Sequence, residues 1–142
     1  SVVVVMDVKK VGLLSRYELF IHNGKKATGL KPAAFAKEAE KLGAGEIMVN
    51  SIDRDGAMNG YDLELVKCVR ESISLPMTVL GGAGSLDHLR ELFKCHGIIG
   101  AAAGSFFVFK GVYRAVLINY PKPQEKDAFI NEVLKEAEEL QL

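Results

Sequence analysis

Residues 46–62 read EIMVNSIDRDGAMNGYD. The apolar run Ile47-Met48-Val49 gives way at Asn50 to a polar loop that contains carboxylates, an arginine and two glycines. A short apolar run is typical of a strand buried in a parallel sheet, and a polar loop at its carboxyl end is typical of an active-site loop in an α/β protein. We therefore expect a central strand and a catalytic loop here, with a helix beginning near Asp62.

The same pattern of strand, loop and helix recurs along the chain. Strands are expected at residues 2–6, 46–50, 76–80 and 98–103, and helices at 32–42, 62–73, 85–96, from Ser105, 112–120 and 125–142. Residues 9–29 are predicted to form a small hairpin excursion, because Asn23-Gly24 is a strong tight-turn signal. Strands that alternate with helices predict an α/β fold with a parallel sheet, and we expect a single domain over residues 1–142.

An open doubly wound sheet and part of an eight-stranded barrel both fit this alternation. A nucleotide-binding open sheet carries its glycine-rich turn after the first strand. This chain has Asp7 there and places its glycine-rich loops after the third and fourth strands. Phosphate sites in barrels use the loops after the last two strands. The positions of the glycines therefore favour TIM-type (β/α) barrel units, as a half-barrel of four parallel strands.

Composition excludes several classes of partner. The 142 residues carry no formal net charge, and 49% of them are apolar and 25% charged. Without a basic stripe, no nucleic acid is expected, and the apolar runs are too short to span a membrane. We recognise no secretory signal, and we expect Cys68 and Cys95 to be reduced packing residues, which predicts a cytoplasmic protein.

Two glycine-rich loops are candidate phosphate sites. They are Gly81-Gly82-Ala83-Gly84 and Gly104-Ser105, and each leads into a predicted helix. Glycines permit close backbone approach, and N–H groups at a helix start attract anions. Either loop alone would be explained as a tight turn, but two on adjacent strands favour one shared phosphate. We expect Asp55-Gly56 to add backbone N–H groups to this site.

The titratable residues leave alternatives open. Asp7 stands where a strand meets a loop, so it can serve as a general acid or base, or simply pair with Lys9 or Lys10. Arg54 lies between Asp53 and Asp55, which favours a loop-bracing ion pair over a catalytic role. The three histidines lack ligand spacing and are interpreted as surface or packing residues, and neither a metal nor a cofactor is expected.

Five motifs together resemble a known family. They are VVVVMDVKK, the 24–29 stretch GKKATG, GAGEIMVNSIDRDGAMNGYD, GGAGSLDH and AAAGSFFVF. Their order and approximate spacing, up to about Lys110, are similar to those of the cyclase subunit of imidazole glycerol phosphate synthase. The resemblance covers strands five to eight of that family's barrel, and the motifs of the first four units are absent.

The resemblance implies a function for each motif. The family is a cyclase-type lyase of histidine biosynthesis, which forms imidazole glycerol phosphate and aminoimidazole carboxamide ribotide with ammonia from a glutamine amidotransferase partner. Asp7 would be one of two catalytic aspartates, and Glu46 an acid of the ammonia gate at the barrel bottom. The second phosphate site would consist of Asp55, Gly56, Gly82, Gly104 and Ser105, with Gly81 in the same loop. The other aspartate and the first phosphate site would lie in the first half.

Two alternatives remain. Asn50 and Leu80 stand where histidine-pathway enzymes carry small hydroxyl residues, which suggests a surface-polysaccharide paralogue that helps to amidate a sugar. A non-catalytic, phosphate-binding half-barrel is the other alternative. Four parallel strands leave two unpaired edges and an apolar inner face, so we expect the missing half-barrel or a second copy of the chain as a partner.

Overall fold

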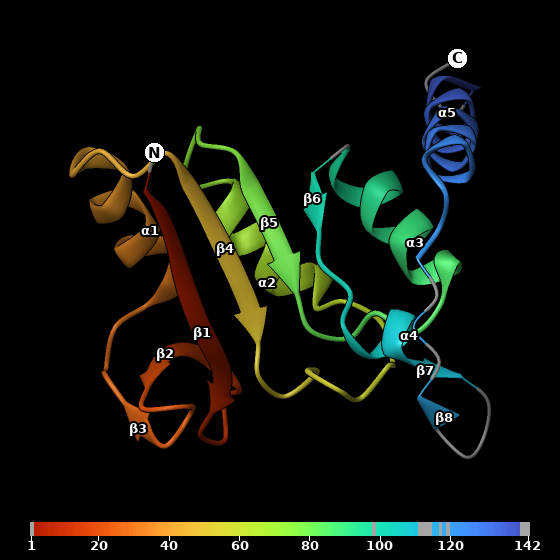
Figure 1. Cartoon of the computed structure of the whole chain (residues 1–142). Coiled ribbons are helices and arrows are strands. Elements are labelled where there is room, and N and C mark those ends of the chain that lie inside the picture. The colour runs from red at the N-terminus through yellow and green to blue at the C-terminus, as the bar shows by residue number, and fades with distance from the viewer. Residues whose placement is uncertain (1, 98, 111–114, 117, 119, 140–142) are drawn as a thin grey trace.

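The main sheet combines parallel strands with a hairpin. The computed structural model describes residues 2–97, 99–110, 115–116, 118 and 120–139. The strands are β1 (Val3–Val11), β2 (Arg16–Ile21), β3 (Lys26–Ala27), β4 (Glu46–Ser51), β5 (Met77–Leu80) and β6 (Gly100–Ala101). Their order in the sheet is β3-β2-β1-β4-β5-β6, and β1, β4, β5 and β6 are mutually parallel (Figure 1).

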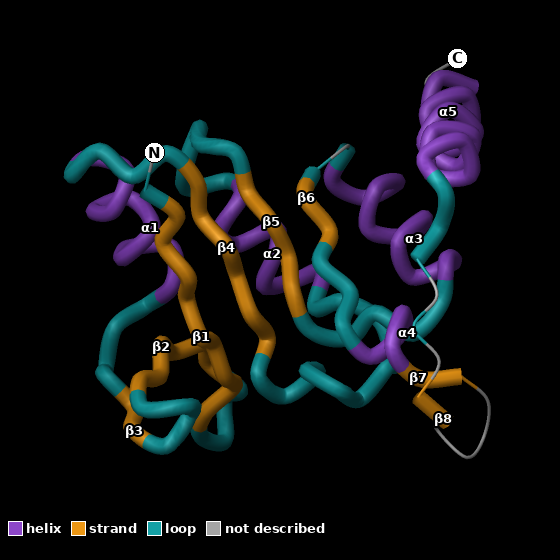
Figure 2. Tube along the Cα trace, in the orientation of Figure 1, coloured by secondary structure: helices purple, strands orange, loops and turns teal. Residues whose placement is uncertain are grey.

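The strand order distinguishes between the two architectures. Each parallel strand lies beside its predecessor, and the order never reverses as it does in a doubly wound sheet. The helices α1 (Pro32–Lys41), α2 (Leu63–Arg70) and α3 (Leu86–His96) follow β3, β4 and β5 in turn, and Figure 2 shows them on one face of the sheet. One-directional winding with helices on one side is the geometry of barrel units, which confirms the predicted half-barrel.

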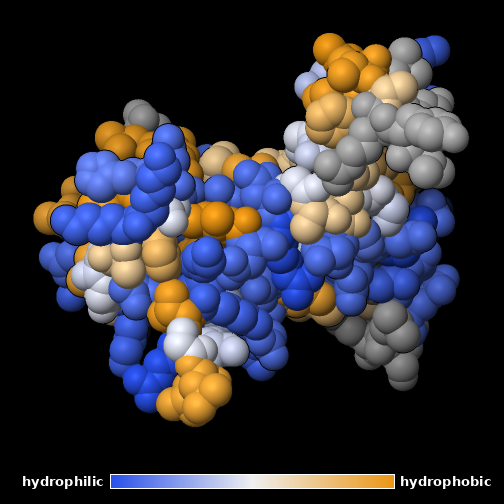
Figure 3. Space-filling model, turned by 90° about the horizontal axis from the view of Figure 1, so that it is seen from below, coloured by the Kyte–Doolittle hydropathy of each residue, from blue (hydrophilic) through white to orange (hydrophobic). Residues whose placement is uncertain are grey.

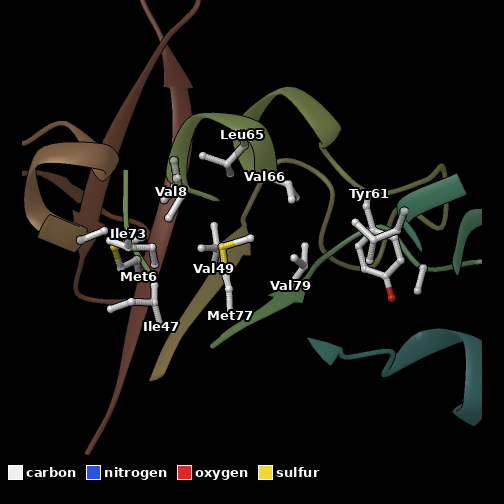
Figure 4. Close-up of a cluster of buried hydrophobic side chains, with 14 of the residues drawn as sticks. Met6, Val8, Ile47, Val49, Tyr61, Leu65, Val66, Ile73, Met77 and Val79 are labelled. Carbon is white, nitrogen blue, oxygen red and sulfur yellow. The ribbon is translucent and has the colours of Figure 1, made fainter. Parts of the chain in front are cut away.

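The core lies between the sheet and these helices. Met6 and Val8 on β1 and Ile47 and Val49 on β4 are completely buried against the helices, with Val66 of α2 among their neighbours (Figure 4). The alternate residues of β1 point the other way, and Val3 and Val5 are 46% and 57% exposed. In the described chain the sheet therefore has one covered face and one open inner face, which would line the inside of a barrel.

The first strand is longer than predicted. Asp7 lies inside β1, because β2 pairs antiparallel with residues Asp7 to Val11 and extends the strand into a hairpin. The predicted hairpin is confirmed, and its turn residues Asn23 and Gly24 both have positive φ angles, of 56° and 74°. Such angles suit the twist of a tight hairpin turn.

The helix predicted over residues 112–120 is wrong where the structure describes it. After the short helix α4 (Ser105–Val108), the chain forms the antiparallel pair β7 (Phe109–Lys110) and β8 (Ala115–Val116), while residues 111–114, 117 and 119 lie outside the described chain. The segment is rich in aromatic and β-branched residues, which favour strands. The fourth parallel strand is also shorter than predicted, and Ile98 lies outside the described residues.

The C-terminal helix packs on α3. Helix α5 (Pro123–Glu139) begins earlier than predicted, since proline suits the first turn, and residues 140–142 are not described. Arg90 and Lys94 of α3 both lie 2.7 Å from the Glu136 carboxylate, and Val133 is buried.

Cys68 and Cys95 are free thiols, but both are exposed, so the expected packing role is wrong.

Asp62 ties the hairpin to α2. Its carboxylate caps the helix by accepting from the Leu65 N–H at 3.2 Å, and it accepts from the Tyr17 hydroxyl of β2 at 2.7 Å. Lys10 and Arg54 lie 4.0 and 3.8 Å from its second oxygen. Burial and the bond to Asp62 raise the pKa of Tyr17, so its hydroxyl remains a donor. Asp62 therefore joins β1, β2, α2 and the loop after β4.

Tyr61 joins two further loops. Its side chain is 3% exposed, and its hydroxyl donates to the Ala102 carbonyl after β6 at 3.0 Å. Burial raises the pKa of Tyr61 to about 12. The loop after β4 is thereby bonded to the loop after β6, across β5.

Replacing Asp62 tests the first of these links. Asp62→Ala removes the helix cap and leaves the Tyr17 hydroxyl with only its long, exposed 3.5 Å bond to Glu64, so we expect a loss of about 2–4 kcal/mol in the free energy of unfolding, measured with urea. Tyr17→Phe removes only the bond from the hairpin and should cost about 1 kcal/mol. Equal losses for the two variants would contradict the role of Asp62 as a cap.

Replacing Tyr61 tests the second link through pH. Folding raises the pKa of the Tyr61 hydroxyl, so the protonated hydroxyl stabilises the folded state. This contribution is complete below the unfolded pKa of about 10 and is lost as pH rises toward 12. The stability advantage of the native chain over Tyr61→Phe should therefore shrink between about pH 10 and about pH 12. Tyr17 is present in both proteins, so its titration cancels. An advantage that is independent of pH would show that Tyr61 ionises equally easily in the folded state.

Candidate active site

The carboxyl ends of β1, β4, β5 and β6 share one edge of the sheet, because these strands are parallel (Figure 1). The loops that follow β4, β5 and β6 meet at this edge. Seen from there, the surface over the middle of the molecule is mainly hydrophilic (Figure 3). This edge is where barrel enzymes place their active sites.

The six residues predicted to bind phosphate lie together. They line one small hollow, to which each of the three loops contributes two: Asp55 and Gly56, Gly81 and Gly82, Gly104 and Ser105. Leu80, Ala83, Ala102 and Ala103 complete the lining. Glycine and alanine leave the backbone accessible, so the hollow suits a small anion held by N–H groups. The expected contribution of the Asp55 N–H is wrong, because this group already donates to the Ser51 carbonyl at 2.9 Å.

Close backbone contact fixes the hollow. The Gly60 N–H donates to the Gly82 carbonyl at 2.8 Å, which joins the loops after β4 and β5. Gly82 has φ of +108°, and a Cβ there would overlap the Gly60 carbonyl. Only glycine fits this position.

Arg54 braces the loop, as predicted, but not through its flanking acids. Its guanidinium donates to the Gly60 carbonyl at 3.0 Å and lies 3.8 Å from Asp62. Asp53 instead accepts from the Lys10 backbone N–H at 3.0 Å and lies 3.8 Å from the Lys9 ammonium. Arg54 thus holds in place the carbonyl group that stands against Gly82.

Asp7 is not paired with a lysine. Its carboxylate accepts from the Asn50 side-chain amide at 2.9 Å, whereas Lys9 and Lys10 pair with Asp53, Asp62 and Glu64. The strand register places Asp7 beside Asn50, and Asn50 beside Leu80, which lines the hollow. Two strand spacings of about 4.8 Å put the Asp7 backbone roughly 10 Å from that of Leu80. Asp7 and the hollow therefore share the rim.

Glu46 lies at the amino end of β4, the strand that carries Asn50. Asn50 is four positions further along, which corresponds to about 13 Å along a strand. Its carboxylate accepts from the Thr78 hydroxyl of β5 at 2.6 Å. Glu46 is therefore part of the amino-end edge, as expected for a residue at the bottom of a barrel.

Three residues of the site were missed or underestimated in the sequence. Tyr61 and the amide of Asn50 make the bonds described above, and His88 accepts the Gly84 N–H on Nδ1 at 3.1 Å, which fixes the loop after β5. The signal that could have found His88 is its position on the first turn of a helix that begins at a glycine-rich loop.

Within the described part of the chain, no three His, Cys, Asp or Glu residues are close enough to hold a metal. None of the described helices is long and apolar enough to cross a membrane.

Known proteins match most of this sequence. The profile of the family described as histidine biosynthesis protein matches residues 1–114. A protein of Leptospira interrogans named "Putative imidazole glycerol phosphate synthase subunit HisF" is 58% identical over 128 residues, which are 90% of this chain and 50% of that protein.

Two further relatives carry the name "Imidazole glycerol phosphate synthase subunit HisF". The protein of Chloroherpeton thalassium is 44% identical over 78% of this chain and 43% of its own length. That of Metallosphaera sedula is 43% identical over 92% of this chain and 49% of its own length. The chain thus spans about half the length of these curated relatives. These matches confirm the family expected from the motifs: the chain belongs to the histidine biosynthesis protein family, whose fold is the TIM barrel.

Proposed function

We propose that this chain forms the second half of a cyclase barrel that uses ammonia from a glutamine amidotransferase partner. Its products would be imidazole glycerol phosphate and aminoimidazole carboxamide ribotide, formed by a lyase reaction in histidine biosynthesis. The names of the full-length relatives support this reaction, and the chain covers about half of each.

The observation that carries the proposal is the hollow formed by three consecutive strand-end loops. Its six proposed phosphate ligands are separated by up to 50 positions in the sequence, from Asp55 to Ser105, yet they line one concavity. A phosphate held there by backbone N–H groups would anchor one end of a phosphorylated substrate. The reacting part of the substrate would then extend toward β1.

Asp7 is the proposed acid or base on that path. It lies on the inner face, two strands from the hollow, and its distance suits a substrate whose phosphate is several bonds from the reacting atoms. General acid–base catalysis by one positioned carboxyl contributes about 10²–10⁴-fold. The second acid of the resembling family has no counterpart in these residues, so we expect the chain alone to be weak or inactive.

Glu46 is the proposed gate residue at the other end of the inner face. The Thr78 hydroxyl fixes one oxygen of its carboxylate. Ammonia released by a partner docked at this end would enter between the strands and travel toward Asp7. The route would be closed on this side by β1, β4, β5 and β6.

The open inner face requires a partner. Val3 and Val5 are about half exposed, and they lie on the face that a closed barrel would bury. We propose that the half of the relatives' length not spanned by this chain covers this face. A second copy of the chain could cover it instead, as a symmetric pair.

Phosphate binding tests the hollow directly. Gly82→Ala places a Cβ against the Gly60 carbonyl, so we expect at least a tenfold loss of affinity for inorganic phosphate, measured by calorimetry. Gly43→Ala is a matched control, because Gly43 also has a positive φ of +91° but nothing lies within 4 Å of its added Cβ. Equal affinity in both variants, or no phosphate binding by the native chain, would contradict the proposed site.

Turnover tests the reaction. The chain mixed with the amino-terminal half of the Leptospira interrogans relative should turn over the phosphorylated ribulosyl substrate with ammonium, and the chain alone should be at least about 100-fold slower. Asp7→Asn should lower turnover of the mixture by about 100-fold or more. Sedimentation of the same samples would show whether the active species contains both halves. Full activity of Asp7→Asn would remove Asp7 from the mechanism.

A further inference from the structure

The inner face carries a layer of three side chains near the catalytic rim. Strand register places Asp7 of β1, Asn50 of β4 and Leu80 of β5 side by side. The Asn50 Nδ2 group donates to Asp7 Oδ1 at 2.9 Å. Leu80 has no polar side-chain atoms. Asn50 is therefore the side chain of this layer that can form a hydrogen bond with Asp7.

The Asn50 amide is held against the loop after β5. Its Oδ1 atom is buried and has no hydrogen-bond partner among the residues that the structure describes. A Cβ built on Gly81 would lie 3.3 Å from this oxygen and 2.6 Å from the Ser51 carbonyl, so only glycine leaves room for the amide as it stands. An ionised carboxylate can only accept hydrogen bonds, so it pairs with the NH₂ side of an amide and repels the oxygen side. Asp7 thus holds the NH₂ end of the amide, and the missing Cβ of Gly81 leaves room for its oxygen end.

We infer that Asn50 is a positioning residue that restricts proton transfer by Asp7 to its Oδ2 atom. A carboxylate has two oxygens, either of which can take a proton. The Asn50 N–H takes one of the two lone-pair positions of Oδ1 and so makes this oxygen less basic, and within the described chain no hydrogen bond or ion pair to Oδ2 is present. A proton removed from substrate therefore goes preferentially to Oδ2, and it returns from there. The inference rests on the proposed function of Asp7 as the acid or base.

The other groups around Asp7 do not compete for this role. Phe20 of β2 lies opposite Asp7 and is apolar. Lys9, two residues along β1, lies 3.8 Å from Asp53, and Glu18 opposite it accepts from the Gly29 N–H. Asn50 is thus the side chain that orients the carboxylate.

The test separates positioning from packing and from substrate binding. Asn50→Leu keeps the number and branching of the side-chain heavy atoms and removes the donor, and Asn50→Asp keeps the shape and replaces the donor by a second carboxylate. In the mixture with the amino-terminal half of the Leptospira interrogans relative, both should lower kcat by about 10- to 100-fold, with KM within about threefold of the native value. Asn50→Asp should be the slower, because its charge repels the ionised Asp7.

Met48→Leu is the matched control, since Met48 lies on the same strand and the same face, one layer below. It should keep kcat within about threefold of the native value. The inference would be overturned if Met48→Leu lost as much kcat as Asn50→Leu. An unchanged kcat in Asn50→Leu, or a rise in its KM alone, would also overturn it.

A second measurement does not depend on turnover. In the isotope-labelled chain, the side-chain amide resonances of Asn50 should move when Asp7→Leu removes the carboxylate, and Met48→Leu should leave them in place. Unchanged Asn50 resonances in Asp7→Leu would overturn the inference. If the Asn50 resonances shift clearly in Asp7→Leu but the native mixture shows no turnover, the contact between Asn50 and Asp7 is supported and the proposed function is contradicted.

Discussion

One backbone contact determines the shape of the rim. The Gly60 N–H donates to the Gly82 carbonyl at 2.8 Å, and the missing Cβ of Gly82 is what allows the two loops to come so close. Arg54 holds the Gly60 carbonyl from the other side, and Tyr61 continues the connection to Ala102 after β6. The hollow exists because these three loops are bonded to one another, and not merely because each follows a strand. Its residues therefore form a single unit.

The division of the sheet into two faces explains the rest of the site. Residues of β1 and β4 that point to the helices build the core, and their neighbours in the sequence build the inner face. Asp7 and Asn50 are the polar pair of the inner face near the rim, whereas Val3 and Val5 of the same face lie further from the rim and are apolar. Stability and chemistry thus use alternate positions of the same strands. The polar pair can be placed without interrupting the core.

Much of this could be predicted from the sequence. Short apolar runs that end in a polar residue or a glycine predicted the parallel strands, and the signal at Asn23-Gly24 predicted the hairpin, because local turn chemistry is specific. The helix predicted over residues 112–120 was wrong at the described residues Ala115 and Val116, since an apolar segment without clear periodicity fits either structure and tertiary packing decides. The contacts of Arg54 could not be predicted, because Gly60 and Asp62 come within its reach only when the loop folds back. Asn50 was noticed as a departure from the family, but its bond to Asp7 depends on the register between β1 and β4.

The central claim is that loops from three strands converge on one anion next to Asp7. The most direct measurement is an amide chemical-shift titration of the labelled chain with inorganic phosphate. The account predicts saturable shifts, with one common dissociation constant, for amides in all three loops, including Gly82 and Ser105, and small shifts at Gly43 and Gly97 on the far edge. Shifts confined to one loop, or different constants for the loops after β5 and β6, would contradict it.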